Sequence, residues 1–240
     1  MKWLPFSWLD LQQLNKKTIV VFVASTLCLV GIQFFGNVDK MPFLLSLIQG
    51  NHYPFYSFVY WALITIFFFA VVPLLVIHFV FHEKPSDYGL KTKQLFGYGK
   101  IYLIAFALIF PLLIVVSFSY QFQATYPFYV PPIEEFVPLY LIAEFLYVLT
   151  FFALEFFFRG FMVHGLKKEM GLYSVFVMTV PYCMIHFAKP LPECVGSIVA
   201  GIFLGLMSYK TNSVWMGAFL HSAVALSMNW LSLWQRGYFG

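Results

Sequence analysis

The stretch that decides the fold is LIAEFLYVLTFFALEFFFRGFMVHGL, residues 141–166. A helix needs about 20 mostly apolar residues to cross a bilayer, and this run supplies them while also carrying Glu144, Glu155 and Arg159. A charge at the centre of a spanning helix costs on the order of 2.5–3.5 kcal/mol, and such residues usually face the interior of a bundle and carry function. The stretch therefore predicts a membrane helix with a polar site on its inner face.

The composition extends this prediction to the whole chain. Of the 240 residues, 61% are hydrophobic and only 10% are charged, with a mean hydropathy of +0.82. Soluble domains carry roughly 25% charged residues, so the composition excludes an ordinary soluble domain, a disordered chain and a coiled coil. The apolar residues come in blocks and do not alternate, which favours helices over a transmembrane barrel.

Seven apolar segments follow one another, so we expect an all-α membrane protein, a polytopic bundle of about seven transmembrane helices. Segments five and six are short, which predicts that they meet inside the bilayer and that residues 187–193, which join them, are buried in protein. The seven segments are residues 18–35, 56–81, 101–118, 138–166, 172–186, 195–209 and 214–234.

The basic residues predict the orientation. With seven spans, 11 of the 14 Lys and Arg residues fall on one side, and such an excess marks the cytoplasmic face. We therefore expect a cytoplasmic N-terminus and an outer C-terminus, in the plasma membrane. The net charge of +4 is modest, and the basic residues border the apolar segments. The expected partner is therefore membrane lipid and not nucleic acid.

Four polar residues on three of the segments form the candidate site. Glu155 and Arg159 are four residues apart and share a helix face, while His186 and His221 come from segments five and seven. Each has a structural alternative, because an ion pair can simply neutralise itself and a membrane histidine often only joins two helices. His164 falls on the opposite face from Glu155 and is expected at the membrane interface. A carboxylate, a guanidinium and two imidazoles together suit the activation of water in a dry site.

These residues resemble the motifs of the CAAX-protease and bacteriocin-processing family of intramembrane proteases. Glu155-Phe156-Phe157-Phe158-Arg159-Gly160 is similar to its Glu-Glu-x-x-x-Arg motif, Tyr182 and His186 to its aromatic residue four before a His, and His221 to its third motif. The resemblance covers about residues 136–232. It divides one integral bundle into N-terminal helices and loops at 1–135 and a catalytic helical core at 136–240.

The resemblance implies an endopeptidase that hydrolyses peptide bonds of membrane-associated or CAAX-like substrates. Glu155 would act as general base on a water that His186 also holds, and His221 would donate to the oxyanion. Two positions depart from the family: Leu154 replaces its first Glu, and Ala225 replaces its small polar residue four after the last His. Glu193 is a candidate substitute for the missing carboxylate, with a salt bridge to Lys189 as the structural alternative.

The sequence leaves alternatives open for both the mechanism and the class of protein. Glu155, His186 and His221 could instead hold a zinc ion, with water as the fourth ligand, and the sequence does not separate this metal site from a metal-free mechanism. A catalytically inactive membrane scaffold or a bacteriocin self-immunity protein of the same fold is favoured by the losses at Leu154 and Ala225. A small transporter that uses the buried charges as a relay is the third class.

Overall fold

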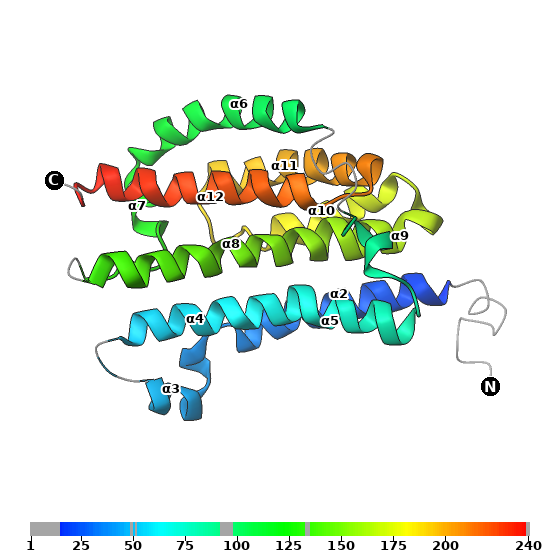
Figure 1. Cartoon of the computed structure of the whole chain (residues 1–240), viewed down its shortest axis with the longest axis horizontal. Helices are drawn as coiled ribbons and strands as arrows, with labels where there is room; N and C mark the ends of the chain where they lie inside the picture. Colours follow the sequence, from blue (N-terminus) through cyan, green and yellow to red (C-terminus); the bar gives the residue numbers. More distant parts are fainter. Residues whose placement is uncertain (1–14, 49, 51, 92–97, 133–134, 239–240) are drawn as a thin grey trace, which may run out of the picture.

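The fold is helical throughout the part of the chain that can be placed. The computed structural model describes residues 15–48, 50, 52–91, 98–132 and 135–238. Within these ranges the only extended pairing is an isolated bridge between Leu90 and Ser213. The long helices run side by side along one direction (Figure 1). The predicted all-α bundle is confirmed.

The bounds agree with the seven apolar segments to within a few residues. Helices α3 and α7 and four π-helical stretches were not expected from the sequence. In chain order the elements are α2 (Lys16–Phe35), η1 (Val38–Lys40), α3 (Pro42–Ile48), α4 (Tyr53–Ile66), η2 (Phe67–Val71, π), α5 (Val72–Leu75), η3 (Val76–Val80, π), η4 (Pro85–Tyr88), α6 (Gly99–Ser117), α7 (Tyr120–Thr125), η6 (Phe136–Tyr140, π), α8 (Leu141–Glu155), η7 (Phe156–Met162, π), α9 (Val163–Met170), α10 (Tyr173–Met184), α11 (Leu191–Thr211) and α12 (Trp215–Gln235).

Five continuous helical stretches of the described residues are long and apolar enough to cross a membrane. They are Lys16–Phe35, Tyr53–Val80, Gly99–Ser117, Phe136–Met170 and Leu191–Thr211. Helix α12 is as long as α11, with 21 residues, but its serines, His221 and Asn229 make it less apolar. Together with the short α10, these helices form an integral membrane bundle of about seven segments.

Helix α10 is the segment that departs most from a simple span. Its 12 residues extend over about 18 Å, too short for a hydrocarbon core of about 30 Å. Figure 1 places the connection from α10 to α11 part-way along the bundle and away from its ends. The prediction that segment six is also short is wrong, because α11 begins four residues earlier than expected, at Leu191, and has 21 residues.

The connection between α10 and α11 is also less buried than predicted. Phe187 is 65% exposed and Ala188 is exposed. Its backbone groups are satisfied within the turn, because the N–H groups of His186, Phe187 and Lys189 donate to the carbonyls of Cys183, Met184 and His186. A segment that satisfies its own backbone groups does not need protein on every side.

Two glycines set the close packing of α10 against α11. A Cβ on Gly205 would lie 2.6 Å from Cγ1 of Val175, and one on Gly201 would lie 3.1 Å from Cδ1 of Tyr182. Small residues spaced four apart let membrane helices approach closely. This approach fixes the position of Tyr182, which belongs to the candidate site.

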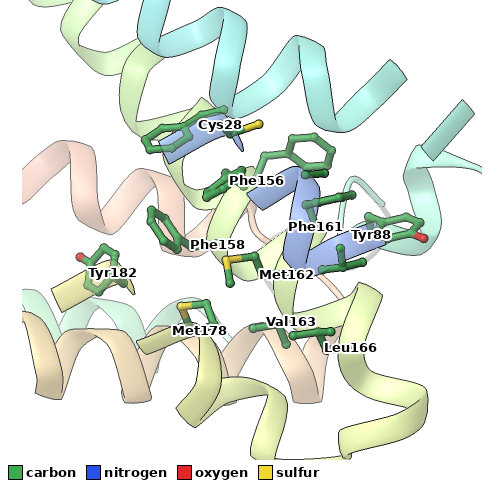
Figure 2. Packing of buried hydrophobic residues seen from close by; sticks show 14 of the residues in the cluster. Cys28, Tyr88, Phe156, Phe158, Phe161, Met162, Val163, Leu166, Met178 and Tyr182 are labelled. Atoms are coloured by element: carbon green, nitrogen blue, oxygen red, sulfur yellow. The ribbon is translucent and has the colours of Figure 1, made fainter. Parts of the chain in front are cut away.

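The largest hydrophobic core surrounds the π-helix η7, all of whose residues are buried. Figure 2 shows how its aromatic and Met side chains meet residues of α2, η4, α9 and α10. The core therefore joins helices from both expected parts of the chain. The labelled members are Cys28, Tyr88, Phe156, Phe158, Phe161, Met162, Val163, Leu166, Met178 and Tyr182.

A polar junction holds α2 to the segment that follows η3. Lys17 Nζ donates to Glu83 Oε2 at 2.6 Å, and the Tyr88 hydroxyl donates to the same oxygen at 2.5 Å. Burial would raise the pKa of the Glu83 carboxyl, but the hydrogen bonds from Lys17 and Tyr88 outweigh it and lower this pKa below its ordinary value.

The topology gives the first testable prediction. The start of α2 and the end of α12 lie at opposite ends of the bundle (Figure 1), and most basic residues border one side. We expect a reporter fused after Gly240 to be active only on the outer face and one fused after Lys91 only on the cytoplasmic face. Activity of both fusions on the same face would contradict an odd number of crossings.

Candidate active site

The centre of the site is the carboxylate of Glu155, which closes helix α8. Its Oε1 atom accepts a hydrogen bond from Nδ1 of His221 at 2.9 Å and lies 3.1 Å from Nη1 of Arg159. Arg159 comes from η7 and His221 from α12. The side chains of Glu155 and Arg159 are fully buried, and that of His221 is 15% exposed. The structure thus joins three of the five predicted site residues.

The guanidinium of Arg159 lies over an aromatic ring. Its Cζ atom is 3.8 Å from the centroid of the Tyr182 ring, within the range of a cation–π contact. The approach to Glu155 is an ion pair without hydrogen-bond geometry, and none of the Arg159 side-chain nitrogens has a hydrogen-bond partner among the described residues. Arg159 therefore depends on the Glu155 charge and the Tyr182 ring for its stabilisation.

His186 follows Tyr182 by four residues and contacts the same tyrosine. Its Nδ1 atom lies 2.8 Å from the backbone carbonyl oxygen of Tyr182, and the two rings have centroids 4.9 Å apart. The His221 ring lies 6.3 Å from the Tyr182 ring. Both Nδ1 atoms face oxygens that only accept, so Nδ1 carries the hydrogen in each ring. Nε2 of each histidine is left free for chemistry.

Helix α12 approaches Glu155 closely because a glycine stands opposite it. A Cβ on Gly217 would lie 3.1 Å from Glu155 Oε2, tighter than most such contacts. That oxygen is buried and has no hydrogen-bond partner among the described residues. Reasoning from the sequence missed Gly217, because glycine carries no chemical signal and only the packing of α12 on α8 gives it a role.

The predicted metal ligands do not form a ligand set. No group of three His, Cys, Asp or Glu side chains within the described ranges could hold a metal ion. Glu155 is committed to Arg159 and His221, and Nδ1 of His186 faces a backbone carbonyl. The arrangement therefore does not fit zinc with Glu155, His186 and His221 as its ligands.

Glu193 has different neighbours from those expected. Both of its carboxylate oxygens lie 2.6–2.7 Å from the hydroxyl of Tyr126, which also accepts a hydrogen bond from Lys189 Nζ at 3.0 Å. No hydrogen bond or ion pair among the described residues joins Glu193 to Glu155, His186 or Lys189. Tyr126 therefore takes the place of the expected salt bridge, and it was missed because it is far away in sequence.

The two positions that depart from the family lie in apolar packing. Leu154 packs against the core around η7. Ala225 is 4% exposed in a cluster with Phe58, Tyr129 and Tyr147. Neither environment offers a polar partner that would replace the missing side chains, so the polar groups of this site are those around Glu155.

His164 is buried within the protein, and its position at the membrane interface stays a prediction. It is 8% exposed, and Nε2 lies 3.1 Å from Ser208 Oγ, which donates to the backbone carbonyl of Arg159 at 3.0 Å. The π-helix η7 separates Glu155 from His164, and its wider turn shifts the helix face that a spacing of 3.6 residues predicts. The Ser208 hydroxyl thus links the His164 ring to the backbone of Arg159.

The matched segment of the chain contains all of these predicted site residues. Residues 136–227 match the family described as type II CAAX prenyl endopeptidase, Rce1-like. The match is to this segment of the chain, from the first residue of η6 into α12. The match confirms the resemblance given by the sequence motifs, and it covers fewer than half of the 240 residues. Neither a curated protein nor a solved structure matches the chain.

The Rce1-like segment begins at the first residue of η6 and ends within α12. It holds Glu155, Arg159, His186, Glu193 and His221, so the family match and the geometry point to the same part of the bundle. The matched family is one of CAAX-type endopeptidases.

The Glu155–Arg159 pair gives the second prediction. Replacing Glu155 with Gln removes the charge opposite a fully buried guanidinium, and breaking such a pair costs about 3–5 kcal/mol. We expect E155Q to lower the free energy of unfolding in detergent by an amount of this order. The double variant E155Q/R159M should recover most of it, because it removes the guanidinium that E155Q leaves buried without a counter-charge.

The matched control is Glu169→Gln, which removes an exposed carboxylate bonded to Asn15 and should change stability by less than about 0.5 kcal/mol. If E155Q is as stable as this control, Glu155 and Arg159 are not coupled. If the double variant is no more stable than E155Q, the unpaired guanidinium is not the source of the loss.

Proposed function

We propose that the protein is an intramembrane endopeptidase that hydrolyses a peptide bond of a membrane-associated substrate. The observation that carries the proposal is the pair of histidines near the Tyr182 ring, each held through Nδ1, with no partner for Nε2 among the described residues. A substrate carbonyl and a water between two imidazoles would meet one proton acceptor and one donor, which is what amide hydrolysis requires.

His221 is assigned as the donor. The Glu155 carboxylate accepts a hydrogen bond from its Nδ1 at 2.9 Å and so orients the ring, as the carboxylate of a hydrolase triad does. When Nε2 also carries a hydrogen, it donates to the oxyanion that forms on the substrate carbonyl. Glu155 then acts behind His221 and not directly on water, which differs from the role expected from the family motif. The reason is geometric, since the Glu155 side chain is fully buried.

His186 is assigned as the base. With Nδ1–H facing the Tyr182 carbonyl, its neutral ring has a lone pair on Nε2. This nitrogen takes one proton from water as the water oxygen bonds to the carbonyl carbon. The same proton then goes to the departing amine nitrogen as the C–N bond breaks. Arg159 holds the Glu155 charge in place throughout these steps.

The test uses purified protein in liposomes with membrane-anchored peptides, both prenylated CAAX-type and unlipidated, and mass spectrometry of the products. Activity should fall at acid pH, because protonation of His186 removes the lone pair with which it accepts a proton from water. We expect H186A and H221A each to lower kcat by roughly 10²–10³, while H78A, which changes an exposed histidine, should leave it unchanged.

The same assay tests the assigned role of Glu155. E155Q should lower kcat in protein that remains folded, because Nδ1 of His221 loses the carboxylate that orients the ring. An unchanged kcat would contradict this role. Absence of cleavage of every peptide by the folded wild-type protein would overturn the protease proposal and favour an inactive scaffold or a self-immunity protein.

A catalytic role of Glu193 stays a prediction. The hydrogen bond from Tyr126 allows this role to be compared with a purely structural one. If Glu193 acts in catalysis, E193Q should abolish cleavage while the protein remains folded. If it only holds the loop through Tyr126, Y126F should impair stability and cleavage as much as E193Q does, because both changes break the same hydrogen bond. Unfolding and cleavage measured on both variants separate the two roles.

A further inference from the structure

A second polar pair lies on the same two helices as the site. Nδ2 of Asn229 in α12 donates to Oε1 of Glu144 in α8 at 2.7 Å, and the two residues are 3% and 9% exposed. Glu144 Oε2 and Asn229 Oδ1 are buried and have no hydrogen-bond partner among the described residues. The Tyr140 hydroxyl lies beside the carboxylate but outside hydrogen-bond geometry. Two acceptors at this point therefore lack donors.

A small cavity of about 10 Å³ is lined by this pair. It has space for the centre of one water-sized group. Phe128, on one wall, is 43% exposed, so this wall reaches the protein surface. The other lining residues are mostly aromatic, and the complete lining is Phe58, Pro127, Phe128, Tyr129, Ala143, Glu144, Tyr147 and Asn229.

The charge of Glu144 is uncompensated. None of the ion pairs found among the described residues includes Glu144. Two basic groups that contact Tyr126 or Phe128 have these residues as partners, because Lys189 lies over the rings of Tyr126 and Phe128 and Arg236 donates to the Tyr126 carbonyl. A lone carboxylate in an apolar bundle is costly, so a ligand that brings positive charge and several N–H donors would complete the site.

We propose that Glu144, Asn229 and the aromatic walls bind a protonated primary amine. An ammonium group is about the size of water, and its three N–H donors match the two free oxygens. Aromatic faces attract cations and commonly surround bound ammonium groups. A guanidinium is planar and larger, so the cavity selects amines over arginine side chains. The amine belongs either to a small free molecule or to a lysine or N-terminus of a peptide.

The position of the site suggests how a peptide would use it. Glu144 precedes Glu155 by eleven residues in one regular helix, which is about 16 Å along its axis. An extended peptide covers this distance in about five residues. If the proposed peptidase function holds, the amine lies about five residues from the bond that is cleaved. This placement rests on that function, whereas the binding of an amine does not.

The binding test compares three salts at equal ionic strength on the purified wild-type protein: methylammonium, sodium and tetramethylammonium chloride. Thermal unfolding is the measurement. Methylammonium alone should raise Tm in a concentration-dependent way, because a ligand that binds only the folded state stabilises it. Tetramethylammonium has no N–H donor and is too large for the cavity.

Equal Tm values in the three salts would overturn the proposal in favour of a bound water or a neutral acid–amide pair. Glu144→Gln provides the matched variant, since its amide still pairs with Asn229 but lacks the charge. The methylammonium shift should vanish in E144Q, and a shift of the same size would place the amine elsewhere. The wild-type comparison stands alone even if E144Q fails to fold.

A peptide series separates the two sources of the amine. Substrates with lysine five residues from the cleaved bond are compared with the same peptides carrying acetyl-lysine, which has no charge. A KM at least tenfold lower for lysine, lost in E144Q, would assign the site to the substrate. Equal KM values would overturn that assignment and leave a free amine. If no peptide is cleaved, the peptidase function fails while the methylammonium result still decides the amine site.

Discussion

The arrangement of the site depends on one constraint, the need of a fully buried arginine for a negative charge. Arg159 has no hydrogen-bonded partner for its guanidinium among the described residues, so the Glu155 carboxylate and the Tyr182 ring must both stay in place. Tyr182 is held by the close packing of α10 on α11, and Glu155 by the approach of α12 at Gly217. Three helices are thus fixed around one ion pair, and the two histidines are carried on them.

The same constraint explains why Glu155 is a poor candidate for direct contact with water. A carboxylate that must neutralise a buried guanidinium and accept from His221 cannot also turn towards substrate without leaving Arg159 unpaired, at a cost of several kcal/mol. The conflict does not arise if Glu155 acts only through its hydrogen bond to His221. The proposed mechanism therefore places the proton transfers on the imidazoles, and it requires no polar side chains at positions 154 and 225.

The seam between α8 and α12 carries two polar contacts of different character. Around Glu155 every charge has a charged or aromatic neighbour, whereas Glu144 has only the amide of Asn229 and an adjacent cavity. The first is complete within the chain, and the second lacks a cation. The Tyr147 and Phe151 rings meet edge to face, and Phe151 contacts the ring of His221. A ligand at Glu144 would lie beside Tyr147, which lines the cavity and joins it through Phe151 to His221.

The sequence by itself determined the class of fold, the helical segments and the residues around Glu155. Hydrophobic length specifies membrane helices, and a charge in such a helix is too costly to be placed without a partner, so Glu155, Arg159, His186 and His221 stood out from their apolar surroundings. The tertiary structure alone decided what those residues contact. Tyr126, Gly217 and the Glu144–Asn229 pair depend on helices that are distant in the chain, and no local pattern encodes such contacts. The π-helix at Phe156–Met162 also rotated His164 into the interior, because its wider turn breaks the regular spacing on which sequence periodicity relies.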